Sequence, residues 1–192
     1  MGKLLLVARA VAYTDIAQAL FSERENTVVI EVPLEKKWKR MQDICRGFHF
    51  TWRKIVSEEF GPEKARKLVL KFWEKTGEET GKLYLMTSKV DPEDVSTIAK
   101  AIVVSSLIMD EDAQIAEASK EKAIIRTIRC PWWEWFRKLG IAGEECKDGC
   151  DIWYESMLRV INPGFENLTT KAFPPGDEFC EHVLTKRYSK RH

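Results

Sequence analysis

The sequence predicts an α+β protein in which an N-terminal helical layer packs on a C-terminal antiparallel sheet. Two observations indicate this class: apolar residues recur every three or four positions through the first half, and β-branched runs with polar interruptions follow in the second half. We expect an N-terminal arm over residues 1–33 and a single α+β domain over residues 34–192. Its helical part should cover residues 34–109, and its cysteine-containing sheet part residues 110–192.

A long amphipathic helix is predicted for residues 34–59. Its apolar residues are spaced three or four apart and therefore share one helical face: Trp38, Met41, Ile44, Cys45, Phe48, Trp52, Ile55 and Val56. We expect this face to pack against the core, with Cys45 as one of its small buried hydrophobes. The pair Gly61-Pro62 ends the helix.

Two further helices are expected before the sheet. Residues 62–86 carry inward-facing apolar residues, and we expect Gly77 and Gly81 to mark a break in this helix. The segment at residues 91–94 combines an N-cap, an early proline and acids that suit the positive end of a helix dipole. A third helix is therefore predicted for residues 95–107.

The last third of the chain predicts two pairs of strands. Residues 113–118 and 123–130 form one antiparallel pair. Residues 166–173 and 179–186 form another, around a Pro-Pro-Gly-Asp turn. If the two pairs join, the result is one antiparallel sheet with helices on one face.

Two shorter helices lie between the strand pairs. Pro131 opens the first, which ends at Gly140, and the second spans residues 144–160. The first carries a block of large aromatic residues: Trp132, Trp133, Trp135 and Phe136. Adjacent tryptophans on a helix cannot all face one core, which indicates a ligand pocket or a partner interface. The alternative, a helix wedged between the sheet and the helical layer, is the interpretation that we favour.

Composition excludes several classes of function. The formal net charge of +1 provides no field that would attract nucleic acid or an anionic membrane, and no apolar run approaches the roughly 18–20 residues that span a bilayer. We therefore expect neither nucleic acid nor a membrane as a partner. Five cysteines, an odd number, and the absence of an export signal indicate a cytoplasmic protein with free or metal-bound thiols. Whether copies of the chain form a homo-oligomer stays open.

Four of the five cysteines fall in the last third of the chain: Cys130, Cys146, Cys150 and Cys180. Thiolates bind soft metals and act as nucleophiles, so this cluster indicates a shared site for a metal, a reactive sulfur or redox pairing. Cys146 and Cys150 lie four positions apart on one helical face, with Cβ atoms about 5–6 Å apart. The alternative is that the thiols pack as small hydrophobes.

Polar residues around the cluster offer further candidates. Asp177 either faces a common site with Cys180 or caps the last turn. Alternation places His182 on the same strand face as Cys180, although a surface position is the interpretation that we favour. Asn162 either donates a hydrogen bond to a substrate or marks an Asn-Pro turn. The sequence has no Gly-rich phosphate loop, His-Glu-x-x-His or Gly-x-Ser-x-Gly motif, which leaves a cysteine- or metal-based mechanism.

Five short motifs follow one another in this region: Arg129-Cys130-Pro131, Cys146-x3-Cys150, Ile161-Asn162-Pro163, Thr169-Thr170-Lys171 and Gly176-Asp177-x-x-Cys180. In this order they resemble the family of L-2-amino-thiazoline-4-carboxylic acid hydrolases, over roughly residues 120–185. Members of that family open a thiazoline ring by hydrolysis to give an S-carbamoyl cysteine. The resemblance therefore implies a small-molecule substrate and hydrolysis of a C–N bond in a small cyclic amidine.

Two mechanisms fit this chemistry. In one, a metal lowers the pKa of bound water towards about 7 and Asp177 carries protons. The ligands would be Cys130, Cys146, Cys150 and Cys180, with zinc or an iron–sulfur cluster as the candidate cofactors. In the other, Cys180 or Cys130 attacks the amidine carbon directly, activated by His182 or a helix N-terminus. Cys180, Asp177 and Asn162 are the candidate catalytic residues.

A more distant resemblance, to the 4-vinyl reductase family of small-molecule-binding domains, gives the alternative of a non-enzymatic sensor-type domain. It implies a zinc site in which Glu144 or Glu145 joins Cys146, Cys150 and Cys180, beside a pocket lined by the tryptophans. Four thiolates alone would instead describe a closed structural zinc site or an iron–sulfur cluster.

Overall fold

The computed structural model describes residues 31–87, 89–174 and 176–187. Most of the predicted N-terminal arm, and residues 188–192, lie outside the described residues. Chain contacts separate residues 1–38 from a second compact unit, residues 39–192. The sheet and the helices that pack on it belong to this second unit. No helix in the described part of the chain is long and apolar enough to cross a membrane.

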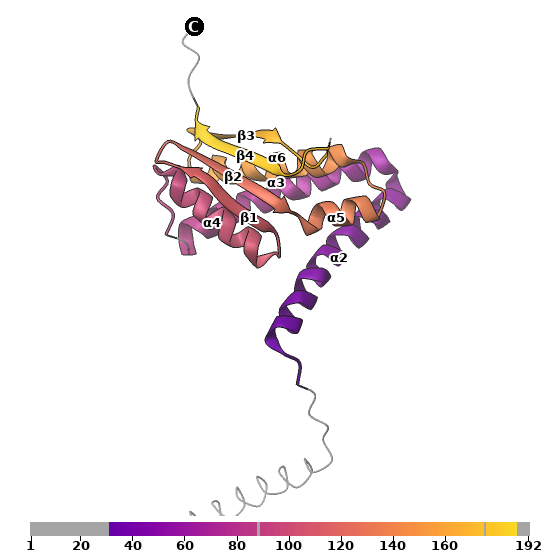
Figure 1. Cartoon of the computed structure of the whole chain (residues 1–192). Helices are drawn as coiled ribbons and strands as arrows, with labels where there is room; N and C mark the ends of the chain where they lie inside the picture. The colour runs from indigo at the N-terminus through magenta and orange to yellow at the C-terminus, as the bar shows by residue number, and fades with distance from the viewer. Residues whose placement is uncertain (1–30, 88, 175, 188–192) are drawn as a thin grey trace, which may run out of the picture. The chain divides into compact units, whose positions relative to one another are not determined.

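The predicted α+β class is confirmed. The elements in chain order are α2 (Leu34–Phe60), α3 (Pro62–Thr87), α4 (Val95–Ile108), β1 (Asp112–Ala118), β2 (Lys122–Arg129), α5 (Pro131–Lys138), α6 (Gly143–Ile161), β3 (Phe165–Lys171) and β4 (Cys180–Lys186). The two predicted strand pairs join through β2 and β4 into one antiparallel sheet of order β1-β2-β4-β3, as Figure 1 shows.

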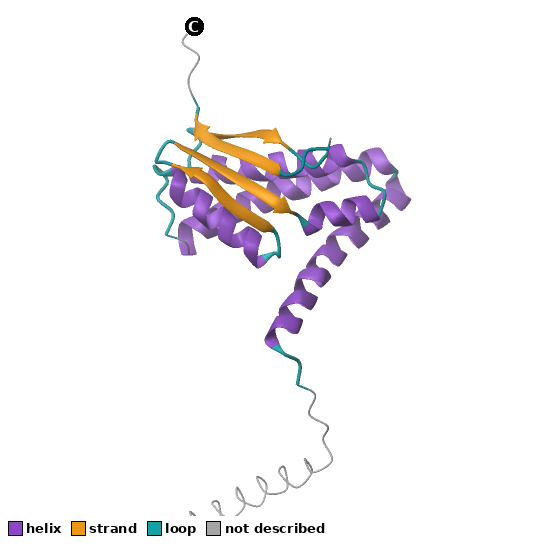
Figure 2. Ribbon diagram, in the orientation of Figure 1, coloured by secondary structure: helices purple, strands orange, loops and turns teal. Residues whose placement is uncertain are grey.

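One face of the sheet is covered by helices. Helix α4 packs on β1 and β2, α6 packs on β3, and α3 packs on α6 (Figure 2). The buried core lies between these layers and is built mainly from Val95, Ile98, Ile102, Ile125, Met157, Leu158, Phe165 and Leu184. Asp94 caps α4, because its side chain accepts a hydrogen bond from the Ser96 amide at 2.9 Å.

Helix α3 is continuous, so the predicted break at Gly77 and Gly81 is wrong. Both glycines lie where α3 meets α6. A Cβ atom on Gly77 would come within 2.5 Å of the Trp153 carbonyl oxygen, and one on Gly81 within 2.8 Å of the Met157 carbonyl oxygen. The glycines therefore allow two helix backbones to approach closely, and they do not interrupt α3.

Helix α2 forms as predicted, but it faces the other way. Its buried side chains include Gln42 and Arg46, whereas Phe48 and Cys45 are exposed. Gln42 Nε2 donates to the Ile108 carbonyl at 2.5 Å, and Arg46 Nη1 donates to the Met109 carbonyl at 3.0 Å. Because the last carbonyls of a helix lack partners within it, donors from α2 satisfy the end of α4. The expected burial of Cys45 and of most of the apolar face is therefore wrong, although Val56 is buried as expected.

Candidate active site

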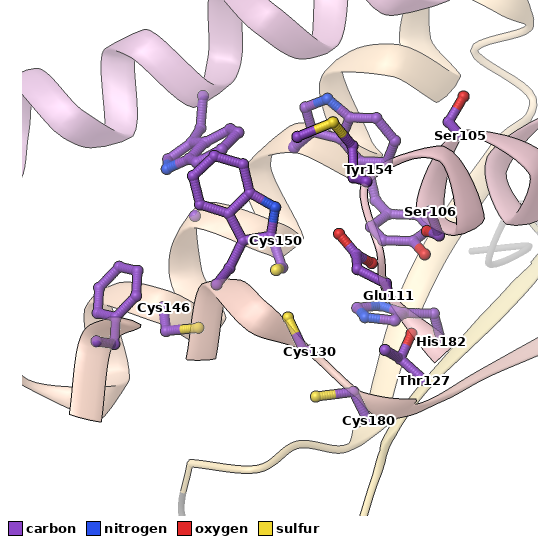
Figure 3. Close-up of a pocket in the computed structure, with 16 residues that line it drawn as sticks. Ser105, Ser106, Glu111, Thr127, Cys130, Cys146, Cys150, Tyr154, Cys180 and His182 are labelled. Carbon is purple, nitrogen blue, oxygen red and sulfur yellow. The ribbon is translucent and has the colours of Figure 1, made fainter. Parts of the chain in front are cut away.

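Residues from the helices and from the sheet line a cavity of about 180 Å³. Figure 3 shows the side chains that line it. Its lining comes from the end of α4, from β2, β4, α5 and α6, and from one tryptophan of α3. All four cysteines of the predicted cluster line it: Cys130, Cys146, Cys150 and Cys180. Trp132 and Phe136 of the aromatic block also line it, so this part of the block forms a pocket wall.

Local structure explains how the thiols converge. Cys130 is the N-cap residue of α5, directly after β2, and Cys180 is the first residue of β4. Thr127 of β2 pairs with Cys180, which brings the end of β2 beside the start of β4. Cys146 and Cys150 lie one turn apart on α6, and both line the cavity. Cys150 has exposed surface, and that surface faces the cavity.

The buried thiols are held in the protonated form. Burial raises the pKa of Cys180 to about 12 and raises that of Cys130 well above its usual value. The pKa of Cys150 is also raised, first by its hydrogen bond with Cys146 and then by burial. A thiolate in a low-dielectric site loses its hydration, and no positive charge lines the described cavity to replace it.

We expect the buried, protonated thiols to be alkylated more slowly than the exposed thiol of Cys45. At pH 7.5, iodoacetamide should modify the exposed Cys45 first and modify Cys130 and Cys180 at least about tenfold more slowly, because only the thiolate reacts. Peptide mass spectrometry over a time course measures the rates. Equal rates at Cys45 and Cys180 would contradict the raised pKa, and a urea-unfolded sample serves as the control.

Among the described residues, no three or more His, Cys, Asp or Glu side chains are grouped so that they could hold a metal ion. Glu145, named above as a candidate ligand, is buried and instead forms a two-pronged ion pair with Arg53, with contacts of 2.5 and 2.8 Å. The zinc and iron–sulfur assignments therefore stay predictions.

Glu111 is an acidic residue of the cavity that the sequence interpretation missed. It follows Asp110, whose φ of 64° turns the chain sharply between α4 and β1. Glu111 lines the cavity together with Ser106 and Trp132. Burial raises the pKa of Glu111 to about 7, whereas the Ser106 hydroxyl, the Arg46 charge and the Trp132 indole act in the opposite direction.

A signal for Glu111 exists in the strand alternation. Ala113 and Ile115 of β1 face inward, and Glu111 lies two positions before Ala113, directly ahead of the first strand residue. An acid in line with the buried face of a strand needs a partner or a function.

His182 lies in the cavity wall and is only 4% exposed, so the favoured surface position is wrong. Its ring stacks on Tyr154 with centroids 4.1 Å apart. The residue does share a cavity with Cys180, as strand alternation indicated. Burial lowers the pKa of His182 to about 4, so the ring is neutral at pH 7.

The hydrogen bonds of His182 select one tautomer. The Thr169 hydroxyl donates to Asp151 Oδ1 at 2.5 Å, so its oxygen is free to accept from His182 Nδ1 at 3.0 Å. Asn167 Oδ1, at 3.3 Å, is a second acceptor for the same nitrogen. The proton therefore resides on Nδ1, and Nε2 carries the lone pair. His182 is thus a neutral acceptor in the cavity wall.

Two of the candidate catalytic residues lie outside the cavity lining. Asp177 Oδ2 accepts from the Ala172 amide at 2.8 Å, which is the turn-capping arrangement. Asn162 follows α6, where Nδ2 donates to the Pro92 carbonyl at 2.9 Å and Oδ1 accepts from the Gly164 amide at 2.8 Å. Both have structural partners, and their catalytic roles stay predictions.

Solved structures share this fold, although no curated protein shows significant similarity to the sequence. The fold is similar to that of a trafficking protein particle complex subunit 3 from Naegleria fowleri, crystallised covalently bound to palmitic acid. The TM-score is 0.54 at 12% identity, over 80% of this chain and 99% of that one.

A second solved structure, the phenol-responsive sensory domain of the transcription activator PoxR with phenol, gives a TM-score of 0.48 at 10% identity. The match covers 73% of each chain. The family model described as L-2-amino-thiazoline-4-carboxylic acid hydrolase matches residues 39–183.

Proposed function

The chain belongs to the L-2-amino-thiazoline-4-carboxylic acid hydrolase family, and on this premise we propose that it hydrolyses a C–N bond of a small cyclic amidine in the four-cysteine cavity. The observation that carries the proposal is Glu111, whose pKa of about 7 lies near neutral pH. A carboxyl group poised in this way takes up and releases protons with equal ease, which general acid–base catalysis requires.

The proposed reaction uses water as the nucleophile. Ionised Glu111 takes a proton from water as the water oxygen bonds to the amidine carbon. Glu111 passes this proton to the ring nitrogen. It then takes the proton of the adduct's hydroxyl and delivers it to the same nitrogen as the bond between carbon and nitrogen breaks. The carbon keeps the water oxygen as a carbonyl, the nitrogen leaves as a primary amine, and Glu111 is ionised again. Water is preferred over a cysteine because the pKa of Cys180 is raised to about 12, so this residue is a neutral thiol.

His182 supports the same step as a hydrogen-bond acceptor. Its fixed tautomer leaves Nε2 unprotonated, which suits the N–H groups of an amidine. The indoles of Trp73, Trp132 and Trp153 provide apolar and aromatic contact for a small ring. These contacts orient the substrate and exclude bulk water from it.

The charge of the cavity favours a cationic amidine without an acid group. The described lining contains the Glu111 carboxyl but neither lysine nor arginine. The buried Arg46 lies behind it and is engaged with the Met109 carbonyl and with Asp43 at 3.2 Å. A ligand carboxylate would therefore be desolvated without a positive partner, whereas an amidinium would pair with Glu111.

A matched pair of ligands tests the proposal. We expect 2-amino-thiazoline to bind at least about tenfold more tightly than its 4-carboxylate. A tenfold difference in affinity corresponds to about 1.4 kcal/mol, and burying the carboxylate without a positive partner costs more than this. Calorimetry measures binding, and mass spectrometry detects the ring-opened product. Tighter binding of the carboxylate would contradict the charge argument.

The same experiment distinguishes the proposed hydrolase from a sensor-type domain that binds a ligand without a reaction. Binding of either ligand without any ring opening would replace the hydrolase with a sensor-type binding domain. Elemental analysis of this protein, and of its Cys146→Ser and Cys180→Ser variants, tests the predicted zinc or iron–sulfur site. Stoichiometric metal that is lost in both variants would restore a metal to the mechanism.

A further inference from the structure

The outward face of α2 carries a continuous apolar stripe. Met41, Ile44, Phe48, Trp52 and Ile55 are 51%, 38%, 73%, 37% and 52% exposed. At 3.6 residues per turn, all five directions fall within about 40° of Phe48. The opposite face of the helix holds Gln42 and Arg46 against the rest of the protein. The inner face also buries Phe50 and Val56, so the stripe is a second apolar face, which a monomeric surface helix would not expose.

The stripe is symmetric about its centre. Its members lie seven and four positions before Phe48 and four and seven positions after it. An identical helix running in the opposite direction would therefore place Met41 beside Ile55 of the second copy, and Phe48 beside Phe48. This self-matching spacing is what a two-fold, isologous contact between identical chains requires.

The charges at the two ends of α2 indicate whether two such helices would pack parallel or antiparallel. Lys39 and Arg40 precede the stripe, and Glu58 and Glu59 follow it. An antiparallel pair would bring the basic end of one helix to the acidic end of the other. A parallel pair would place like charges side by side, which is unfavourable. We infer that the chain forms a homodimer in which two α2 helices pack antiparallel, with the two-fold axis at Phe48.

Sedimentation equilibrium of the full chain at micromolar concentration tests this inference. We expect twice the chain mass of 22.3 kDa. Phe48→Glu should reduce the mass to that of one chain and leave the circular dichroism spectrum unchanged. Leu168→Glu is the matched control, because Leu168 is also an exposed apolar residue, at 59%, but lies on β3. It should remain dimeric. A single-chain mass for the unmodified protein, as expected if another part of the same chain covers the stripe, would overturn the dimer.

Cross-linking tests the direction of packing. In a Cys45→Ser background, Phe48→Cys should form a disulfide between two copies under mild copper-catalysed oxidation, because position 48 meets itself at the axis. Ile55→Cys should not, since two copies of position 55 would lie 14 residues apart along the helix, about 21 Å. Equal cross-linking at both positions would indicate parallel helices and would overturn the antiparallel arrangement.

Discussion

Glu111→Gln is expected to lower the rate of amidine hydrolysis by about 10²- to 10⁴-fold, the usual contribution of a positioned acid–base group. The substitution keeps the size of the side chain and its ability to hydrogen-bond Ser106, so the fold should be retained. In the unmodified protein, the rate should depend on a group with a pKa of about 7, and this dependence should disappear in the variant. Steady-state assays from about pH 5 to about pH 9 measure both the loss of rate and its pH dependence.

The exposed Glu134 of α5 provides the control. Glu134→Gln removes one carboxylate from the same region of the chain and should leave the rate within about twofold, since exposed surface changes usually have small effects. Full activity in Glu111→Gln would remove Glu111 from the mechanism. Equal loss in the two variants would point to an effect of net charge.

The same substitution has an independent effect on stability. The folded protein keeps the Glu111 proton up to pH about 7, whereas the ordinary pKa of a glutamate, which applies to the unfolded chain, is 4.5. Between these values the unfolded state binds fewer protons, so the free energy of unfolding falls as pH rises through this window. Glu111→Gln should therefore be more stable than the unmodified protein at pH 8, by about 1–3 kcal/mol, and this gain should vanish near pH 4. Urea denaturation at both pH values measures the difference.

Gly77→Ala is expected to lower the free energy of unfolding by about 2–3 kcal/mol through overpacking. A new Cβ atom would lie 2.5 Å from the Trp153 carbonyl oxygen and 3.0 Å from the Ser156 Cβ atom. The nearest obstacle is backbone, so relief requires α3 and α6 to separate. Alanine in a helix interior normally stabilises by about 0.5–1 kcal/mol relative to glycine, and the clash must exceed this gain.

Gly47→Ala is the matched control for this prediction. Gly47 also lies inside a long helix, but apart from its chain neighbours and the backbone of its own helix, no atom lies within 4 Å of the position that its Cβ atom would take. The alanine should therefore stabilise the protein by about 0.5–1 kcal/mol. Urea titrations of the two variants and the unmodified chain give the values. A stable Gly77→Ala protein would show that the α3–α6 contact adapts at little cost.

Local patterns in the sequence were sufficient to predict the elements and their order. Interactions within a few residues determine where helices begin, as at Pro62, at Pro131 and at the cap formed by Asp94. The convergence of the four cysteines also follows from local rules, because a strand pairing and one helical turn bring them together. The helix starts and the cap required no knowledge of long-range packing, whereas the convergence of the cysteines also depends on the pairing of β2 with β4, which the sequence offered only as a possibility.

Long-range packing accounts for the errors. Apolar periodicity located α2 but could not show that its polar face satisfies the carbonyls at the end of α4. Its glycines suggested a break in α3. Gly77 is instead required because the backbone of Trp153, 76 positions later in the sequence, lies against it. His182 was placed at the surface because its acceptors, Asn167 and Thr169, come from the adjacent strand β3. Glu111 was overlooked because its environment is assembled from α4, α5 and α6.

Arg46 connects the outer helix to the acid of the cavity. Its guanidinium holds the carbonyl of Met109, which lines the cavity, and its positive charge lowers the pKa of Glu111. Any displacement of α2 changes the distance from this charge to the carboxyl and therefore shifts the proton equilibrium of Glu111. By thermodynamic reciprocity, uptake of a proton or of a cationic ligand at Glu111 biases the position of α2 by the same free energy.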